Sequence, residues 1–346
     1  MKIGMAIEYA RDPLAQLAKV PDYERAGVDL VWVAEAYGID AVSVMGYLAS
    51  ITNTVEIASG ILPIYTRTPS LLAQTAVGLD TLSNGRFILG LGASGPQVIE
   101  GWHGVKYERP IQATREVIEI CRKIWARDEP VTYDGRHFTL PLPPEDGTGL
   151  GKPLKIINHP KRADIPILLA SLGPKNVELT AELANEWLPV FFVPERAMSV
   201  WGEDLDRGNA KRHSALGSMG IIAGGPVAIG TDDEVGRYRD LGRPMAALYI
   251  GGMGAKGRNF YNDLVSRYGW EAEAEQIQDL YLAGHKEDAM AAVPDELLAA
   301  TSLIGDLGYV RERVDAYREA GVTTLNVTPV GPDPVRVIEQ LRDIVG

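Results

Sequence analysis

Short apolar runs alternate with longer amphipathic segments along most of the chain, a pattern typical of β-strands alternating with α-helices. The first apolar run, 2–7, is followed by a helical period over 14–26 and by a second apolar run at 30–34. The second run has no polar position, as expected of a strand covered on both faces. Further runs of this kind bring the predicted strands to eight: 2–7, 30–34, 55–61, 86–91, 165–170, 187–192, one within 218–229, and 323–327.

Helical periods fill the intervals and predict helices at 41–51, from 69, at 111–125, 173–184, 310–320 and 334–345. Eight strands that alternate with helices predict an α/β fold of the (β/α)8 TIM-barrel type. Two segments exceed the length of a crossover: 128–163, rich in Pro and Gly, and 232–303, mostly helical. We interpret both as excursions from a single domain over 1–346, the first covering one barrel end. Two domains are the alternative, but no linker separates self-sufficient halves.

Composition narrows the classes of function. The net charge of −12 provides no overall attraction to nucleic acid or to anionic membranes. The chain opens on an apolar strand without a signal-peptide pattern, and no uncharged stretch reaches membrane-spanning length, so we expect a cytoplasmic protein that acts on a small molecule. The single cysteine, Cys121, cannot form an internal disulfide or a thiolate metal cluster. None of the five histidines has metal-ligand spacing, so we expect no metal site.

In such a barrel, the loops after the C-terminal strand ends converge on one cavity, so residues at these exits are the site candidates. Many are small, which leaves room for a flat ligand against the backbone. For any one glycine a turn explains the residue better, but together the exits favour a bound cofactor. The candidates for cofactor binding are Ser59, Gly60, Ile61, Gly92, Ala93, Ser94, Ala170, Ser171, Leu172, Gly173, Gly224 and Gly225.

Two other glycine patterns and two basic segments bear on the ligand. The segment 90–95 lacks the G-x-G-x-x-G spacing and no helix is predicted directly after it, so NAD is disfavoured. Segments 147–163 and 241–262 contain Lys and Arg but no Asp or Glu, and either could receive an anion. Lys175 adds a cation at a predicted helix start, where free backbone amides favour phosphate.

Proton-handling candidates at the exits are Glu8 in the pair Glu8–Tyr9, Glu35, Tyr37 and His103. A partly desolvated carboxyl group can act as a general acid or base near neutral pH. The alternative for Glu8 and Glu35 is a structural role in hydrogen bonds to the barrel backbone. The exit serines do not lie in a G-x-S-x-G motif, so no hydrolytic triad is predicted.

Taken together, the exits resemble those of the bacterial luciferase-like barrel superfamily, in particular its coenzyme F420-dependent oxidoreductases. The resemblance spans nearly the whole chain and rests on LVWVAEAY (30–37), IASGILPIYTRTP (57–69), LDTLSNGRFILGLGASGPQVIEGWHG (79–104), LASLGPKN (169–176) and YIGGMGAKGRNFYN (249–262). It implies a deazaflavin across the barrel mouth, backed by a nonprolyl cis peptide at Gly60–Ile61. The coenzyme tail would lie near Ala93–Ser94, 170–173 and the segment after the seventh strand.

Departures from the family pattern concern the acid/base machinery. Related sugar-phosphate and alcohol dehydrogenases carry His after the acidic residue of the second exit, where this chain has Ala36, and Trp near Asp40. They carry Glu in the loop after the fourth strand, where this chain has Ser94-Gly95-Pro96. The resemblance therefore implies F420-dependent hydride transfer with a small organic substrate, and among the acid/base candidates we favour Glu35.

The sequence leaves open two other functions and the possibility of a homodimer. An FMN-dependent monooxygenase of the same superfamily and a noncatalytic F420-binding protein are the alternatives to the oxidoreductase. The helical segment 261–281, which contains Tyr and Trp, is a candidate homodimer face or a cover for the barrel.

Overall fold

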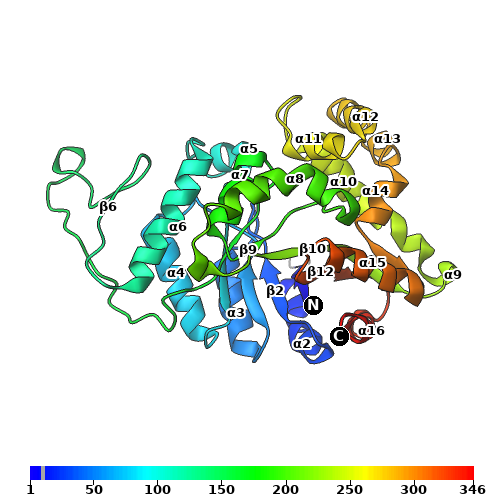
Figure 1. Ribbon diagram of the computed structural model, residues 1–346, viewed down its shortest axis with the longest axis horizontal. Coiled ribbons are helices and arrows are strands. Elements are labelled where there is room, and N and C mark those ends of the chain that lie inside the picture. The colour runs from blue at the N-terminus through cyan, green and yellow to red at the C-terminus, as the bar shows by residue number, and fades with distance from the viewer. Residues whose placement is uncertain (9–11) are drawn as a thin grey trace.

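The computed structural model describes residues 1–8 and 12–346, and it shows a ring of strands with helices around it (Figure 1). The barrel strands of the described chain are parallel, and the ring closes because β9 pairs with β10, β10 with β12 and β12 with β1. The predicted TIM barrel is therefore confirmed. Its eight strands are β1 (Lys2–Ala6), β2 (Leu30–Val33), β3 (Glu56–Ser59), β5 (Phe87–Gly92), β8 (Ile167–Leu169), β9 (Glu186–Trp187), β10 (Gly220–Ile229) and β12 (Thr324–Pro329).

Two short strands lie outside this ring. Strand β4 (Leu62–Pro63) pairs with the end of β5, and β11 (Leu303–Gly305) pairs with the C-terminal end of β10. Strand β9 is shorter than the predicted 187–192, because Pro189 has no amide hydrogen to donate to a neighbouring strand.

Helices on the outside connect the strands, and most lie within a few residues of their predicted bounds. The predicted helix over 14–26 is wrong, because Pro21 is tolerated only in the first turn of a helix and so starts a new one. The prediction that no helix follows segment 90–95 is also wrong, since a helix begins at Pro96. The outer helices that connect the strands are α1 (Pro13–Leu17), α2 (Val20–Ala26), α3 (Ala41–Ile51), α4 (Pro69–Leu82), α5 (Pro96–Gly101), α6 (Pro110–Ala126), α7 (Pro174–Leu183), α8 (Pro194–Asn209), α15 (Leu307–Glu319) and α16 (Pro334–Val345).

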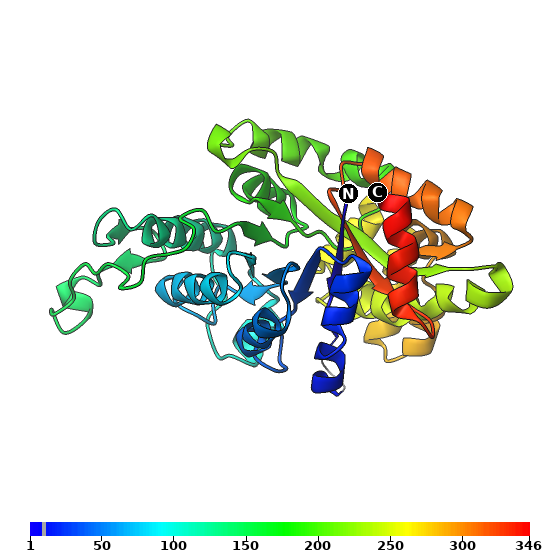
Figure 2. The same ribbon diagram turned by 90° about the horizontal axis from the view of Figure 1, so that it is seen from below.

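The segment 128–163 forms an arm that projects from the flank of the barrel in both ribbon views (Figures 1 and 2). It contains the hairpin of β6 (Tyr133–Asp134) and β7 (Thr139–Leu140). The arm is fixed at its root, where the Glu116 carboxylate on α6 accepts backbone hydrogen bonds from residues 136–138. The hairpin is thus held on α6 and the arm projects from the flank, so the expectation that it covers one barrel end is wrong.

The second excursion is mostly helical, as predicted, and lies between β10 and β11. Its helices are α9 (Asp232–Val235), α10 (Arg243–Ala247), the π-helical turn η4 (Leu248–Gly252), α11 (Phe260–Arg267), α12 (Glu271–Leu282), α13 (Lys286–Ala291) and α14 (Asp295–Ala300). Helices α11, α12 and η4 pack against one another beside the barrel mouth, and their buried side chains are continuous with the main hydrophobic core.

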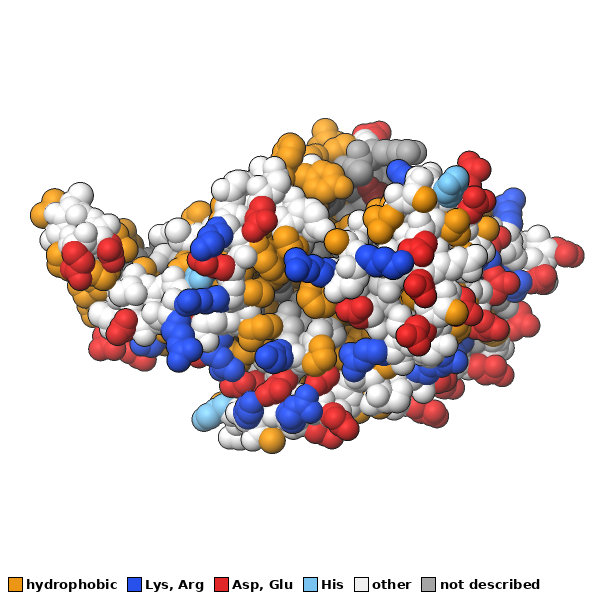
Figure 3. Space-filling model, turned by 90° about the horizontal axis from the view of Figure 1, so that it is seen from above, with side chains coloured by type: hydrophobic (Ala, Val, Ile, Leu, Met, Phe, Trp, Pro, Cys, Tyr) orange, Lys and Arg blue, Asp and Glu red, His pale blue; other side chains and the backbone are white. Residues whose placement is uncertain are grey.

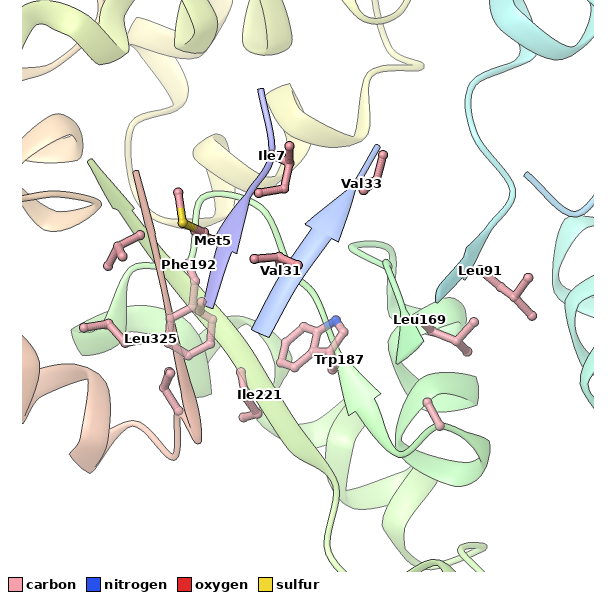
Figure 4. Packing of buried hydrophobic residues seen from close by; sticks show 14 of the residues in the cluster. Met5, Ile7, Val31, Val33, Leu91, Leu169, Trp187, Phe192, Ile221 and Leu325 are labelled. Atoms are coloured by element: carbon pink, nitrogen blue, oxygen red, sulfur yellow. The ribbon is translucent and has the colours of Figure 1, made fainter. Parts of the chain in front are cut away.

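Alternation along the strands divides the core into two layers, because successive side chains of a strand point to opposite faces. Val31 and Val33 belong to the layer between strands and helices, part of which is drawn in Figure 4. The opposite face fills the inside of the barrel with Leu30, Ala58, Ile88, Leu168, Leu188 and Ile222. Trp32, Ile61 and Ala170 are partly buried against this inner cluster and lie toward the C-terminal strand ends. They form an apolar floor beneath the mouth.

Charged groups lie at the opposite, N-terminal end of the barrel. Lys2 and Glu56 form an ion pair of 2.6 Å. Glu186 shares this end, and its Oε2 is buried with no hydrogen-bond partner among the described residues. Burial raises the pKa of the Glu186 carboxyl to about 7; the nearby Lys2 lowers it and Glu56 raises it.

The raised pKa makes stability depend on pH with a definite sign. Between the ordinary Glu value and about pH 7, unfolded chains lose a proton that the folded protein keeps. The folded state therefore loses about 3 kcal/mol of stability as the pH rises from 4.5 to about 7. We expect Glu186→Gln to remove this loss, so that the variant gains about 3 kcal/mol over wild type at pH 8 relative to pH 4.5. Urea denaturation at both pH values measures the difference.

The exposed Glu339 on α16 provides the control, because its side chain is in solvent. Glu339→Gln is expected to leave the pH dependence of unfolding unchanged. A Glu186→Gln variant whose advantage is equal at both pH values would show that folding does not raise the pKa of this carboxyl.

Candidate functional site

The floor of the mouth is built around Trp32. Its indole Nε1 donates a hydrogen bond to Oδ1 of Asn326 on β12 over 2.8 Å, across the inside of the barrel. The ring lies against Gly60, where a Cβ atom would be 2.3 Å from Trp32 Cε3. Gly224 in turn lies against the backbone of Asn326, whose carbonyl oxygen would be 2.2 Å from a Cβ. Residues from β2, β10, β12 and the end of β3 thus form one packed surface.

The peptide bond Gly60–Ile61 is cis, as the family resemblance implied. It follows β3 directly, and the Ile61 side chain turns toward β5, where its Cγ1 would be 2.9 Å from a Cβ on Gly92. Gly60, Ile61 and Gly92 therefore lie together at the mouth, with Ala170 packed against the same inner cluster.

Most of the glycines at the exits leave room for the protein's own atoms. The Cβ positions of Gly60, Gly92 and Gly224 meet Trp32, Ile61 and Asn326, and that of Gly225 is 1.9 Å from the carbonyl oxygen of Thr301. Close packing thus explains these glycines without a ligand, and their part in cofactor binding stays a prediction. Gly173 differs, because its nearest neighbour is the Phe260 ring at 3.5 Å, an ordinary contact.

Two of the candidate serines use their hydroxyl groups inside the protein. The Ser59 hydroxyl donates to the Gly90 carbonyl and accepts from its amide, each over 2.8 Å. The Ser171 hydroxyl shares a hydrogen bond of 2.7 Å with Thr180 on α7. Both side chains are buried. They hold β3, β5 and α7 in place rather than present a hydroxyl to solvent.

The remaining cofactor candidates lie at the starts of helices. Ala93 and Ser94 precede α5, and Ser94 has a left-handed φ of 59°. The Leu172 carbonyl accepts a hydrogen bond from the Trp201 indole. Gly173 occupies the cap of α7, and its carbonyl accepts from the Asn176 amide over 3.0 Å. Because Pro174 has no amide hydrogen, the Lys175 amide is left in the first turn, and with the exposed Lys175 side chain it is suited to an anionic group.

Glu35 is held in an ion pair that the sequence alone did not predict. Arg67, from the loop after β4, donates to both carboxylate oxygens, and the amide of Ala41 at the start of α3 also donates to Oε2, over 3.0 Å. The two side chains are only 9% and 14% exposed. Three donors occupy the carboxylate, which favours a structural role for Glu35 over proton transfer.

Arg67 also reaches Asp40, over 2.8 Å, so two carboxylates share one guanidinium. Its hydrogen bond to Glu35 raises the pKa of Arg67 above the usual value, against the opposing effect of burial. Burial would raise the pKa of Asp40, but hydrogen bonds from Ser43 and Arg67 lower it below the ordinary range. Arg67 and Asp40 therefore stay ionised at neutral pH, and the cluster fixes the loop after β2 to that after β4.

His103 and Glu8 occupy different settings. His103 follows α5, and its ring Nε2 is buried without a hydrogen-bond partner among the described residues. A buried polar atom of this kind ordinarily has a partner, so it is suited to a bound ligand. Glu8 lies directly after β1 and is exposed. Tyr9 lies outside the described residues.

The basic segments are largely engaged elsewhere. In segment 147–163, Arg162 pairs with Asp80 and Lys155 donates to the Asp128 carbonyl. In segment 241–262, Lys256 pairs with Asp279 over 2.7 Å. Neither segment thus presents a free cationic cluster to an anion.

A surface hollow lies at the other end of the barrel, near the start of β10. Met219, Ile221 and Gly321 line it, and its Arg212 donates to four backbone carbonyls. The arginine is therefore fully used in structure, although His213, Asp206 and Glu319 also line this hollow. Residues 1–8 and 12–346 contain no cluster of His, Cys, Asp or Glu that could hold a metal. No helix among them is long and apolar enough to cross a membrane.

Sequence reasoning missed Arg67, Trp32 and Asn326. Arg67 lies within IYTRTP, a segment used for the family resemblance, but its partner comes from another βα loop. Trp32 stands two positions after Leu30, so period-two alternation places it on the inward face. That signal could have identified the floor of the mouth.

Comparisons with known proteins agree with this geometry. The model of the luciferase-like monooxygenase family matches residues 3–324. The chain is 41% identical over 345 residues to a proposed coenzyme F420-dependent oxidoreductase of Mycobacterium tuberculosis, covering 99% of each chain. Its fold is similar to that of the coenzyme F420-dependent tetrahydromethanopterin reductase of Methanopyrus kandleri, with a TM-score of 0.77, 23% identity and 99% and 98% of the chains covered. An F420-dependent secondary alcohol dehydrogenase gives a TM-score of 0.75 at 17% identity, with both chains fully covered.

Proposed function

This chain belongs to the luciferase-like monooxygenase family, and we propose that within it the chain is a coenzyme F420-dependent oxidoreductase that exchanges a hydride with a small organic substrate. The apolar floor at the barrel mouth carries the proposal. Trp32, Ile61 and Ala170 close the barrel beneath a partly exposed surface, against which a planar ring can lie. The name of the Mycobacterium tuberculosis relative supports F420 over FMN as that ring.

The residues around the floor fit such a coenzyme. The apolar floor would back the ring, and the backbone amide and side chain of Lys175 at the start of α7 would hold an anionic tail. The orphaned Nε2 of His103 is a polar atom in need of a partner on the same side of the barrel. When bound, F420 supplies a ring carbon that accepts or donates the hydride.

We assign the role of acid and base in the proton transfer to His103 rather than to Glu35. Hydride transfer from an alcohol carbon requires a base for the hydroxyl proton, and the reverse reaction requires an acid. The Glu35 carboxylate already accepts from Arg67 and Ala41, so it has little capacity left. The His103 imidazole retains a free ring nitrogen among the described contacts. Glu8, exposed after β1, is the second candidate.

Ligand titration tests the cofactor. We expect the apoprotein to bind F420 with a change in deazaflavin fluorescence and to bind FMN at least 10-fold more weakly. Trp32→Ala, which removes the largest side chain of the floor, is expected to weaken F420 binding about 10-fold, since stacking and burial contribute about 1.5 kcal/mol. The control, Trp270→Ala, removes a buried tryptophan from the helical insertion between β10 and β11. It is expected to leave F420 affinity unchanged if the variant folds.

The other outcomes separate the alternatives. FMN binding with oxygen consumption would make the protein a flavin monooxygenase. Tight F420 binding without single-turnover oxidation of any substrate in a panel of alcohols would make it a noncatalytic carrier. Absence of binding to both coenzymes would overturn the assignment.

A further inference from the structure

Two groups of aromatic side chains lie at the mouth on segments that are distant in sequence. Trp102, at the end of α5, and Tyr37, after β2, have ring centroids 6.3 Å apart. Tyr249 on η4 and Tyr261 on α11 are 4.7 Å apart, and Phe191, after β9, lies 6.0 Å from Tyr249 and 6.3 Å from Tyr261. We call these five residues the aromatic band.

The two halves of the band lie at the same end of the barrel. Burial raises the pKa of Tyr249, and the phenol of Tyr37 adds to this effect. All five residues follow the C-terminal ends of β2, β5, β9 and β10, the end where barrel enzymes bind their substrates. The band therefore lies on the same side of the barrel as the floor.

The exposed half of the band has no structural explanation within the chain. Tyr37 is 69% exposed and Trp102 is 66% exposed. Phe260, at the start of α11 and beside Gly173, is 63% exposed. Single exposed apolar residues are common, but adjacent large aromatic side chains mark a binding surface. Figure 3 shows hydrophobic side chains gathered around a hollow in the middle of one face, with Lys and Arg side chains at its edge.

The carboxylate nearest to the band along the chain is held in an ion pair. Glu35, two residues before Tyr37, is paired with Arg67, which also pairs with Asp40. The band itself contributes ring faces and the hydroxyl groups of three tyrosines. Such a surface recognises a flat, uncharged ring by offset or edge-to-face stacking and gives little to a charged or small aliphatic molecule.

We propose that the aromatic band binds the substrate, and that this substrate is a planar, uncharged aromatic compound with a carbonyl group or the corresponding alcohol. The inference rests on the proposed function, which supplies the coenzyme. In the reducing direction, the carbonyl carbon gains a hydride from reduced F420 and the oxygen gains a proton, giving a secondary alcohol and oxidised coenzyme. The ring stacks on Trp102 and Tyr37 while the carbonyl points toward the floor.

Two ketones of similar size distinguish ring stacking from simple carbonyl binding. The probes are 2-acetylnaphthalene, which is planar, and 2-acetyldecahydronaphthalene, which has the same carbon skeleton in saturated form and is not planar. Their binding is measured by saturation-transfer NMR on the full chain, with and without F420. We expect 2-acetylnaphthalene to bind at least 10-fold more tightly.

The variants Trp102→Ala and Tyr37→Ala are each expected to weaken 2-acetylnaphthalene binding about 5-fold, with F420 affinity unchanged. Both residues are exposed, so truncation leaves the core intact, and either variant alone suffices as a test. Tyr47→Ala, on the outer helix α3 and 41% exposed, is the matched control and is expected to have no effect.

Equal affinity for the two ketones, or losses no larger than that of the control, would overturn the inference. This failure is distinguishable from failure of the proposed function, because F420 binding is measured independently. A protein that binds 2-acetylnaphthalene through the band but not F420 would keep the aromatic site and lose the coenzyme assignment.

Discussion

Replacing Arg67 with methionine is expected to lower the free energy of unfolding by about 3–5 kcal/mol, the effect of removing one partner from a buried ion pair. Methionine keeps most of the length of the side chain but removes the guanidinium. Among the described residues, the Glu35 carboxylate, 9% exposed, would then keep only the Ala41 amide as a donor, and Asp40 would lose its cation. Urea denaturation at pH 7 measures the loss.

The second partner and an exposed pair give the controls. Glu35→Gln combined with Arg67→Met is expected to be more stable than Arg67→Met alone, because no unpaired buried charge is left. Arg25→Met breaks an ion pair with Asp22 in which both side chains are at least half exposed, and it is expected to cost less than about 1 kcal/mol. If Arg67→Met were no more harmful than Arg25→Met, Glu35 would be free for acid/base chemistry after all.

The fold was predictable because its signals are local. Continuous apolar runs mark strands buried on both faces, and the last helix is observed at the predicted residues, Pro334–Val345. The errors also have local causes: Pro21 divides one helix, and Pro189 limits β9. The direction of the arm was not predictable, because it depends on contacts of Glu116 with a hairpin 20 residues further along the chain.

The site was only partly predictable, because its decisive contacts join residues far apart in sequence. Trp32 and Asn326 are 294 positions apart, and Arg67 and Glu35 are 32 apart. Such pairs require the register of a closed barrel, which no local pattern specifies. The Gly60–Ile61 cis peptide was expected from a family resemblance, not from composition or periodicity.

The role of the glycines was also not predictable from the sequence. A glycine at a strand exit is compatible with a ligand, a turn or a close neighbour, and the sequence does not tell which atom lies opposite. The structure resolves this for Gly90, inside the β3–β5 pair, where a Cβ would be 1.6 Å from the Ser59 carbonyl oxygen and 2.7 Å from its carbonyl carbon. Both neighbours are backbone atoms and cannot rotate away.

Gly90→Ala is therefore expected to lower the free energy of unfolding by more than about 4 kcal/mol, or to prevent folding, the range of the most severe single substitutions. Separating the strands enough to admit the methyl group would also break the two hydrogen bonds between the Ser59 hydroxyl and Gly90. Because β3 leads directly into Gly60, F420 binding is expected to fall together with stability. Circular dichroism during urea denaturation and F420 titration measure the two losses.

Gly78 on α4 is the matched control for the same chemical change, because no atom lies within 4 Å of its Cβ position. Gly78→Ala is expected to raise the free energy of unfolding by about 0.5–1 kcal/mol, since alanine restricts the unfolded chain and favours the helix. The two variants should therefore move stability in opposite directions. A folded Gly90→Ala protein with wild-type stability would mean that β3 and β5 are farther apart than described. The position of Gly60 and Ile61 in the floor would then also differ from the one described.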